Sequence, residues 1–497
     1  MKVCLVLQRQ FAYIGHNVAL WLKEKHGVQN FCGYVYQRWS YDFLKNQKDV
    51  KYSSLLLDED IHKEYLNEKL DLEYLKILEK KYGLPNLWPY IALDRVLMFN
   101  QVVREYPYNT PAYTHEEMMR IFQVKARAII KFLETEKPDA ILFPNIGGIG
   151  TMVLYEVAKK MGIKPLILLT ACTEDRYVFS EKFDYFTDVE KLIAKNKNQS
   201  SSYLTQAKQF IENFRNKPEP YHPDVLNALK TINRRNQLKF LYPTNFIKSL
   251  SWFVQVIKIY FTNRKFNDYS DNFNPWYYLL DRVKRKFRNL IGTNNLYDSY
   301  TPEEDFGFFP LHLEPEVSTL LNAPFYTDQI CLIKQIARSL PLHFKLYVKE
   351  HPLMAEYRPR KYYKELKKIP NVKLINPKIN GLDIVSKAKI IFPITSTAGW
   401  EGALLKKPVI AFGDQFFNIL SMVKKCKEIE QLPFMIQDSL ENYKYNEQEV
   451  LNLLAAIFED SIPLNLHQLW EQETDMTKKR LGTEQLANLL AKKIIND

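Results

Sequence analysis

Cysteine patterns that hold small secreted domains or zinc sites together are missing from this sequence. The five cysteines are scattered through 497 residues, without a CxxC pair and without regular spacing. They are Cys4, Cys32, Cys172, Cys331 and Cys426. A disulfide framework or a zinc site is therefore not expected, and a reducing compartment fits this usage.

Long apolar runs are missing as well. The sequence contains no stretch of 18 apolar residues, so we expect no segment that crosses a bilayer. The opening MKVCLVLQRQF places only five apolar residues between Lys2 and Gln8, which is shorter than the core of a signal peptide. These absences predict a cytoplasmic protein whose chain opens with a buried strand over residues 2–7.

What is present is a globular composition with an uneven charge. Hydrophobic residues make up 46% of the chain, charged residues 25% and aromatic residues 14%. A chain of this length exceeds one ordinary hydrophobic core, which predicts two or three domains. The net charge is +12, and residues 230–290 alone carry thirteen Lys or Arg against three Asp. The excess charge therefore belongs to one segment rather than to the whole surface.

The amino-terminal half alternates strand-like and helix-like segments. Short apolar runs predict strands at residues 2–7, 31–36, 140–144 and 165–170. Helical patterns are clearest at residues 18–25, 60–81, 114–134 and 151–161, and residues 8–17 are expected to form a loop. Because strands that alternate with helices indicate a parallel sheet, we expect a Rossmann-like unit here.

A glycine-rich turn, Gly147-Gly148-Ile149-Gly150, precedes the last of these helices. Its spacing is not GxGxxG, and no acidic residue is suitably placed for a ribose. One interpretation is a tight strand-to-helix turn that uses the backbone freedom of glycine. The other is close approach of a substrate to the start of the helix.

Basic and aromatic residues dominate the segment between residues 195 and 300. Phe246, Leu250, Phe253, Ile257 and Phe261 recur at helical spacing. An amphipathic helix of this composition suits either packing against the α/β domains or contact with an anionic bilayer. We favour packing for the aromatic stripe and membrane contact for the charges. No nucleic-acid-binding motif accompanies the basic patch, so nucleic acid is not expected as a partner.

The alternation of strands and helices resumes at residue 304. Strands are predicted at residues 306–310, 344–348, 372–375, 390–395 and 409–412. Helices are predicted at residues 327–339, 359–369, 382–389, 397–406, 418–425, 443–459 and 483–494. Polar residues follow two of the strands: Lys349, Glu350 and His351 after one, Ser396 and Thr397 after another. Since ligands of open α/β sheets bind at the carboxyl ends of the strands, we expect the site of chemistry here.

The run Ser396-Thr397-Ala398-Gly399 lies between a predicted strand and a predicted helix. Two hydroxyls, a glycine and the unpaired N–H groups of a helix start suit a phosphate. Ser and Thr also cap ordinary helices, which is the other interpretation. Glu401, in the first turns, is placed either to accept from ribose hydroxyls or to complement the helix dipole.

His351 precedes Pro352, which ends the strand and leaves the histidine at the carboxyl end of the strand. An imidazole there can donate to a phosphate oxygen and assist a departing phosphate. Lys349, two residues earlier, favours that role. Arg358 is interpreted either as a further contact to an anion or as part of a solvated helix start.

Together these elements resemble the carboxy-terminal half of the bacterial capsular polysaccharide biosynthesis proteins, a family that includes Kdo transferases and looks like GT-B glycosyltransferases. The resemblance covers roughly residues 304–420. Its motifs are Lys349-Glu350-His351-Pro352, Tyr357-Arg358-Pro359, Pro370-Asn371-Val372, residues 395–401 and 407–413 and, more weakly, Pro310-Leu311-His312, Pro315-Glu316 and Gln329. The His-Pro pair with a Ser/Thr loop is also similar to bacterial sialyltransferases, which use these residues to bind the phosphate of CMP.

The resemblance implies a donor site for a nucleotide sugar. His351 and the Ser396-Thr397 loop would hold its phosphate, and Glu401 its ribose. The donor-binding residues expected in this way are Lys349, His351, Arg358, Ser396, Thr397, Gly399 and Glu401.

Two motifs of related enzymes are missing. There is no DxD-like metal motif, and the Glu-x7-Glu pair of retaining GT-B enzymes is interrupted because Val409 stands eight residues after Glu401. The resemblance therefore implies an inverting transfer without a metal ion. Such a transfer needs a general base for the acceptor hydroxyl, and the candidates are His16, Glu174 and Asp175.

The predicted fold class is α/β, with two Rossmann-like lobes of GT-B type and a basic–aromatic helical insertion between them. The expected domains are an acceptor lobe at residues 1–195, the insertion at 196–303, a nucleotide-sugar lobe at 304–440, and helices packing across the lobes at 441–497.

The predicted function is the transfer of a sugar from a nucleotide sugar to a saccharide or lipid-linked acceptor in surface polysaccharide assembly, with CMP-linked sugars among the candidate donors. No cofactor beyond the donor is expected, and residues 230–290 would bring the protein to the inner face of an anionic membrane. One alternative is a nucleotide-sugar 2-epimerase of the same architecture, which needs no acceptor. The other is a non-catalytic protein that binds polysaccharide or membrane.

Overall fold

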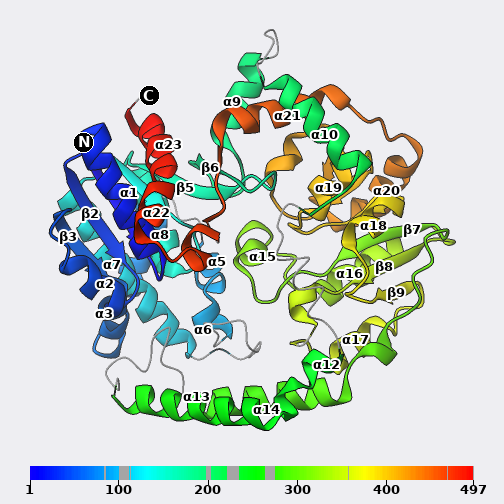
Figure 1. The fold of residues 1–497 in the computed structure, drawn as a ribbon, viewed down its shortest axis with the longest axis horizontal. Helices are drawn as coiled ribbons and strands as arrows, with labels where there is room; N and C mark the ends of the chain where they lie inside the picture. The colour runs from blue at the N-terminus through cyan, green and yellow to red at the C-terminus, as the bar shows by residue number, and fades with distance from the viewer. Residues whose placement is uncertain are drawn as a thin grey trace. The chain divides into compact units, whose positions relative to one another are not determined.

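The structure is a computed structural model that describes residues 1–497 except 83–85, 100–110, 112, 197–202, 221–233, 263–274, 356, 467 and 496–497 (Figure 1). The described residues divide into two compact units. The amino-terminal unit comprises residues 1–196, with the gaps named above, and residues 455–495. The central unit comprises the described residues of 203–454.

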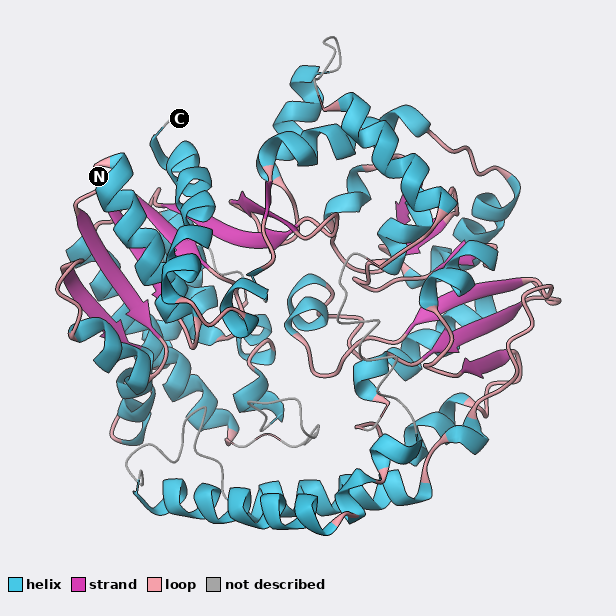
Figure 2. Cartoon of the chain, viewed as in Figure 1, coloured by secondary structure: helices cyan, strands magenta, loops and turns pink. Residues whose placement is uncertain are grey.

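The amino-terminal unit is built on a mixed sheet, whose strands are magenta in Figure 2. In spatial order its strands are β13 (Ile462–Pro463), β6 (Arg176–Ser180), β5 (Lys164–Thr170), β4 (Ala140–Phe143), β1 (Lys2–Leu7), β2 (Asn30–Val35) and β3 (Tyr52–Leu57). Strands β1 to β5 are parallel, and β6 and β13 add an antiparallel edge. The apolar runs of β1 and β2 are buried almost throughout, as expected for central strands covered on both faces.

The first and last helices of the chain share the core of this unit. α1 (Phe11–His26) packs against α23 (Glu484–Ile495), and their apolar side chains join one buried cluster with β1. The other helices of the unit are α2 (Arg38–Lys45), α3 (Asp58–Lys63), α4 (Leu72–Lys81), α5 (Trp88–Ala92), α6 (Arg95–Phe99), α7 (His115–Glu136), α8 (Ile149–Lys160), α9 (Thr187–Asn196) and α22 (Met476–Gly482). α7 starts at a capping box in which Thr114 and Glu117 bond each other's backbone N–H groups.

The central unit is built on a second sheet, in which every strand pair is parallel. In spatial order its strands are β12 (Val423–Lys425), β11 (Val409–Ala411), β10 (Ile390–Ile391), β7 (Phe306–Pro310), β8 (Lys345–Lys349) and β9 (Val372–Ile375). The helices are α10 (Leu204–Asn216), α12 (Arg234–Gln237), α13 (Pro243–Thr262), α14 (Pro275–Ile291), α15 (Val317–Asn322), α16 (Gln329–Ser339), α17 (Arg360–Leu366), α18 (Gly381–Lys387), α19 (Ala398–Leu404), α20 (Leu432–Glu441) and α21 (Glu447–Asp460), which continues past residue 454.

The predicted fold class is confirmed: the protein is α/β with two Rossmann-like sheets, and a helical segment lies between them in the chain. Two local predictions were wrong. The loop expected at residues 8–17 is mostly helix, because Ala12, Ile14 and Val18 already bury one face of α1 against the sheet. The helix expected at residues 418–425 is not formed, and the last three of these residues form the edge strand β12, which pairs with β11. This strand is too short for its sequence to show the alternation of apolar and polar residues that is typical of a strand.

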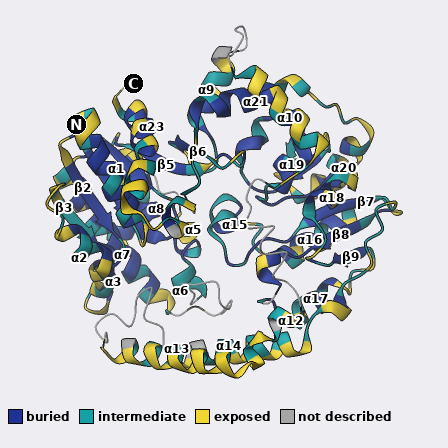
Figure 3. Ribbon diagram, viewed as in Figure 1, coloured by how far each residue is buried: buried dark blue, intermediate teal, exposed yellow. Residues whose placement is uncertain are grey.

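The packing interpretation of the aromatic stripe was also wrong for most of its length. Phe246, Leu250 and Phe261 of α13 are exposed, and only Phe253 and Ile257 are partly covered. Figure 3 shows the exposed residues of α13 and α14 in yellow along the two helices. Among the described residues, no helix is both long enough and apolar enough to cross a membrane.

Candidate functional site

The strand order of the central sheet identifies where a ligand can bind. β7 and β10 are neighbours; the chain moves outward from β7 through β8 to β9, and outward on the other side from β10 through β11 to β12. In this doubly wound order the direction of the crossovers reverses between β7 and β10. Ligands of such sheets bind in the crevice at the carboxyl ends of the strands where the direction reverses.

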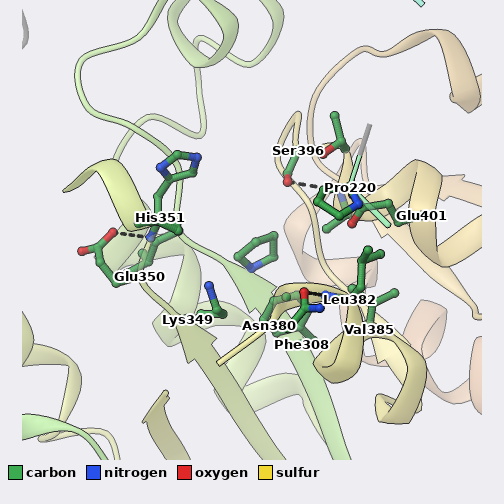
Figure 4. A pocket seen from close by; sticks show the side chains of 16 residues that line it. Pro220, Phe308, Lys349, Glu350, His351, Asn380, Leu382, Val385, Ser396 and Glu401 are labelled. Atoms are coloured by element: carbon green, nitrogen blue, oxygen red, sulfur yellow. Dashed lines mark hydrogen bonds between the residues drawn. The ribbon is translucent and has the colours of Figure 1, made fainter. Parts of the chain in front are cut away.

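A pocket of about 140 Å³ lies at these carboxyl ends, and Figure 4 shows it from close by. Its lining comes from the ends of β7 and β8, the loop after β8, the start of α18, the loop after β10 and the start of α19, together with Pro220. Of the predicted donor-binding residues it brings together Lys349, His351, Ser396, Thr397 and Glu401. The volume suits a phosphate with part of a ribose, since pockets for whole drug-sized ligands start at about 300 Å³.

His351 stands at the mouth of β8, as the sequence predicts. It caps the short turn Pro352–Met354, and its Nδ1 accepts a hydrogen bond from the N–H of Leu353 at 3.2 Å. In the neutral ring the proton is then on Nε2, which makes that nitrogen the hydrogen-bond donor. A donor at the pocket wall suits a phosphate oxygen.

Lys349 and Glu401 set the charge of the pocket. Burial lowers the pKa of Lys349 to about 8, although the carboxylates of Glu350 and Glu401 oppose this shift. Burial also raises the pKa of Glu401 to about 7, against the opposing charge of Lys349. Near neutral pH the lysine is therefore mostly charged while Glu401 is close to half-protonated. This balance leaves a buried ammonium whose carboxylate neighbour is only partly ionised, which suits an anionic ligand.

The Ser396 loop reaches the pocket with two hydroxyls. Ser396 Oγ accepts from the N–H of Ala398 at 3.2 Å, which closes a tight turn before α19, and the Thr397 side chain makes no capping bond. Gly399 does not line the pocket but faces the ring of Phe417. A Cβ added at Gly399 would be 2.7 Å from that ring. The glycine is thus required by packing, whereas Ser396 and Thr397 line the pocket.

Glu350 and Arg358 support the loop that carries His351. The buried Glu350 carboxylate accepts from Arg358 Nη1 at 2.5 Å, from the His351 N–H at 2.6 Å and from the Tyr363 hydroxyl at 2.9 Å. Arg358 is itself buried, and its Nη2 donates to the carbonyl of His312 at 2.5 Å. Arg358 is therefore engaged behind the pocket and does not line it.

His312 ties the end of β7 to the Ser396 loop. Its Nε2 accepts from the N–H of Thr395 at 3.1 Å, and burial together with the charge of Arg358 lowers its pKa to about 3, so the ring is neutral. Gln329 accepts from the His312 N–H at 2.8 Å. In the sequence, His312 and Gln329 appear only as the weaker part of a family pattern, because 83 residues separate His312 from Thr395.

The start of α18 contributes lining residues that the sequence does not single out. Asn380 caps this helix through its Oδ1, which accepts from the N–H of Leu382 at 3.1 Å, and Val385 follows on the pocket side. The pair Asn380-Gly381 before an apolar run is a helix-start signal that marks the position. Nothing in the local pattern indicates that it faces a pocket.

The three candidate bases belong to the amino-terminal unit. His16 is buried in α1, its Nδ1 is 3.1 Å from the Tyr52 hydroxyl, and burial lowers its pKa to about 4. Glu174 and Asp175 lie in the turn from β5 to β6, where Glu174 is exposed. Asp175 Oδ2 accepts from the side-chain amide of Asn465 at 3.0 Å.

The glycine-rich turn before α8 is filled by the protein's own side chains. Asp94 accepts from the N–H of Ile149 at 3.1 Å, the position in which a helix start would bind an external anion. A Cβ at Gly148 would be 3.0 Å from Asp94 Oδ2, and one at Gly150 would overlap the Tyr34 hydroxyl. The packing supports a tight structural turn rather than a substrate site.

Within the part of the chain that the structure describes, no group of three or more His, Cys, Asp or Glu side chains is arranged to hold a metal ion.

Comparison with a family of known proteins agrees with the resemblance seen in the sequence. Residues 202–430 match the family described as capsule polysaccharide biosynthesis protein. All of the pocket's lining residues fall within this range, from Pro220 to Glu401. The predicted resemblance to this family is therefore confirmed over the segment that carries the pocket.

Individual proteins are more distant. Protein FixF of Sinorhizobium fredii (strain NBRC 101917 / NGR234) is 28% identical over 130 residues, which are 26% of this chain and 31% of that protein, so the match spans about a third of the relative. The beta Kdo 2,7 transferase of Thermosulfurimonas dismutans KpsC has 12% identity and a TM-score of 0.38, with 86% of this chain and 97% of that chain covered. UDP-GlcNAc 2-epimerase from Neisseria meningitidis, bound to UDP-GlcNAc, has 13% identity and a TM-score of 0.28, with both chains covered fully. At these scores neither similarity bears on the arrangement of the site.

Proposed function

We propose that this chain, whose residues 202–430 match the capsule polysaccharide biosynthesis family, is a glycosyltransferase that takes its sugar from a nucleotide sugar. The observation that carries the proposal is the pocket at the carboxyl ends of β7 and β10. An imidazole donor, a buried ammonium, two hydroxyls and a carboxyl group that titrates near neutrality meet there. These groups match the phosphate and the ribose of a nucleotide.

The roles follow from the chemistry of each side chain. His351 Nε2 donates to a phosphate oxygen, and Lys349 supplies positive charge beside it. Both become more favourable as the bond from the anomeric carbon to the phosphate oxygen breaks and negative charge grows on the departing nucleotide. Ser396 and Thr397 provide further hydroxyl donors, and Glu401 accepts from the ribose hydroxyls. A CMP-linked donor fits the resemblance to sialyltransferases.

Inverting, metal-independent transfer completes the proposal. The acceptor hydroxyl attacks the anomeric carbon from the side opposite the phosphate, and a base takes its proton. The base comes from the amino-terminal unit, where His16, Glu174 and Asp175 are the candidates. Of these, the exposed carboxylate of Glu174 has the simplest access to an acceptor, whereas His16 is held in the core.

The acceptor is a growing or lipid-linked saccharide of a surface polysaccharide. In this proposal the enzyme works at the cytoplasmic face of the cell membrane, which it contacts peripherally through residues 230–290. The excess of thirteen basic over three acidic residues in that segment supports attraction to anionic lipids. Nucleic acid is not among the proposed partners.

Nucleotide binding and turnover of a His351→Ala variant test the site. Loss of one preorganised hydrogen-bond donor to developing charge lowers turnover about 10²- to 10³-fold, so we expect transfer to fall by at least that factor. Binding of the nucleotide, followed by calorimetry, weakens as well, and the melting temperature without ligand stays the same. His343→Ala is the matched control, because His343 is exposed before the start of β8. Unchanged turnover in His351→Ala would contradict the site assignment.

A screen of CMP-, UDP- and GDP-linked sugars tests the function itself. Binding of a donor at 100 times its dissociation constant stabilises the protein by about 2.7 kcal/mol, which a thermal shift detects easily. We expect one nucleotide class to raise the melting temperature and the sugar to remain unchanged without an acceptor. Conversion of the donor in the absence of acceptor would indicate an epimerase. No shift with any donor would indicate a non-catalytic protein.

A further inference from the structure

The two helices α13 and α14 turn an apolar stripe toward solvent. On α14 the exposed residues Leu280, Val283 and Phe287 recur every three or four positions, and the side chain of Phe287 is 64% exposed. On α13 Phe246 is 62% exposed and Val254 57%. In an ordinary soluble domain this stripe faces the core. Here the same periodicity is present, but the apolar residues of the stripe are exposed. Figure 3 colours the exposed residues of both helices yellow.

α13 packs against α14, and α14 is attached to the rest of the central unit. The rings of Phe253 and Trp276 pack edge to face at 6.4 Å between α13 and α14. From α14, Arg288 Nη1 donates to the carbonyl of Tyr357, and the Arg285 guanidinium lies 5.1 Å from the centre of the Tyr357 ring. The exposed stripe is therefore a fixed feature of the unit that carries the pocket.

Exposed lysines accompany the stripe on both helices: Lys248 and Lys258 on α13 and Lys284 on α14. α14 carries four more basic residues within the range 282–288, of which Arg285 and Arg288 contact Tyr357 on the inner side. Together the two helices hold seven Lys or Arg and a single acidic residue, Asp281, which is buried. Apolar and aromatic side chains bordered by cations are the composition of helices that lie in the plane of a bilayer interface.

We infer that the outward faces of α13 and α14 form one docking surface for an anionic bilayer, with the apolar stripe in the headgroup and acyl boundary and the cations at the phosphates. A second copy of the chain is a poor occupant. It would bring the exposed lysines of two copies together, and within the described residues of the two helices the single acidic side chain, Asp281, is buried. Anionic lipids supply both the apolar depth and the opposite charge.

The docking surface would bring the donor pocket to a lipid-linked acceptor, and in this respect the inference rests on the proposed function. Tyr357, held by Arg288, directly precedes Arg358, which bonds Glu350 behind His351. A bilayer bound to α14 therefore has a fixed orientation relative to the central unit's pocket.

Cosedimentation of the full chain with vesicles tests the docking surface without donor or acceptor. One vesicle preparation is phosphatidylcholine alone and the other contains roughly a third phosphatidylglycerol, at about 0.1 M salt so that screening is moderate. We expect at least tenfold tighter binding to the anionic vesicles. The double variant Val283→Asp/Phe287→Asp loses most of this binding, and Lys248→Glu/Lys258→Glu reduces it severalfold.

The matched control places the same charges on exposed apolar residues elsewhere in the central unit. Leu342→Asp/Phe434→Asp changes two side chains that are 103% and 68% exposed and lie outside α13 and α14. We expect this variant to bind vesicles like the unmodified protein. Equal loss of binding in both double variants would overturn the inference, as would equal binding to the two vesicle types. A dimer in light scattering that Val283→Asp/Phe287→Asp dissociates would assign the surface to a second copy instead.

The two proposals fail separately. If Val283→Asp/Phe287→Asp still shows the nucleotide-induced thermal shift, its fold is intact and the vesicle result concerns the surface alone. If vesicle binding is as expected while no nucleotide sugar binds, the docking surface stands and the glycosyltransferase proposal falls.

Discussion

The two sheets of this protein have the same order of strands around the point where their crossovers reverse, but the protein's own side chains occupy this point differently in the two units. In the amino-terminal sheet β1 and β4 are the neighbours, and in the central sheet β7 and β10. After β4 the carboxylate of Asp94 already occupies the helix start at Ile149. After β10 the Ser396 loop borders a pocket. A shared topology therefore offers a ligand site in both units, and the protein's own side chains decide which one remains available.

Buried ion pairs show the same contrast. In the amino-terminal unit Lys125 pairs with Asp58 at 2.5 Å, and the Tyr34 hydroxyl donates to the same carboxylate. In the central unit Arg358 pairs with Glu350 at 2.5 Å. The first pair lies beneath the closed glycine turn, since the Tyr34 hydroxyl occupies the space beside Gly150. The second holds the backbone of His351 at an open pocket.

The largest expected effect comes from removing one partner of each pair. Asp58→Ala removes the carboxylate paired with the buried Lys125, and Glu350→Ala removes one of the two carboxylates paired with the buried Arg358, which keeps Glu314 at 3.1 Å. Loss of a partner from a buried pair costs about 3–5 kcal/mol of unfolding free energy, and we expect the smaller loss for Glu350→Ala because Arg358 retains a counter-ion. Only Glu350→Ala should also weaken nucleotide binding, because it alone releases the His351 loop. Urea denaturation and calorimetry on both variants measure the two effects. Equal nucleotide affinity in folded Glu350→Ala would remove the assigned difference between the pairs.

Asp94→Ala tests directly whether the Asp94 carboxylate closes the anion site at the start of α8. Asp94 accepts from the N–H groups of Val96 and Leu97 at 3.0 and 3.2 Å as well as from Ile149, so its loss leaves several buried donors unsatisfied. We expect a loss of about 1–3 kcal/mol in the unfolding free energy. Because the helix start then lacks its internal anion, inorganic phosphate should raise the melting temperature of this variant more than that of the unmodified protein. Equal shifts in both would contradict a closed anion site.

Ser396→Ala and Thr397→Val test the open pocket of the central unit. Each removes one hydroxyl from the pocket wall while keeping the backbone turn. A single neutral hydrogen bond contributes about 0.5–1.5 kcal/mol, so nucleotide affinity should fall roughly two- to tenfold per variant. Calorimetric titration measures this loss, and Ser249→Ala on α13 is the matched control. A larger loss at Ser249 would contradict the placement of the site.

The smallest effect is a shift in pH dependence. The pKa of Lys349 is about 8, so the lysine loses its proton, and the nucleotide its cationic partner, as the pH rises past that value. Glu401 raises the pKa of Lys349, hence Glu401→Gln should lower it and move the fall in affinity to lower pH by less than about one unit. Affinities measured between about pH 6 and pH 9.5 check this. A fall that moves to higher pH would contradict the sign.

Much of the fold could be predicted because buried parallel strands are short apolar runs. β1, β7 and β9 coincide with the predicted segments, β8 is shifted by one residue, and β11 is one residue shorter than predicted. The unpredicted strands β3, β6, β12 and β13 lie toward the edges of their sheets, where half-exposed residues obscure the pattern. α13 was predicted at the right place, but its apolar face was expected to pack against the protein and is mostly exposed. The reason is that periodicity indicates an apolar face on a helix but not what covers that face.

The amino-acid sequence alone predicts which polar residues follow which strands, because the end of a strand is a local feature. Lys349, His351, Ser396 and Thr397 line one pocket, as their positions after two predicted strands indicate. Only the tertiary structure decided that Arg358, from the same motif, turns to Glu350 and His312 instead. Only it placed Asp94, 55 residues before Ile149, on the glycine turn. The physical reason is burial. Desolvation forces each buried charge and N–H group to find a partner, and the partner can come from any distance along the chain.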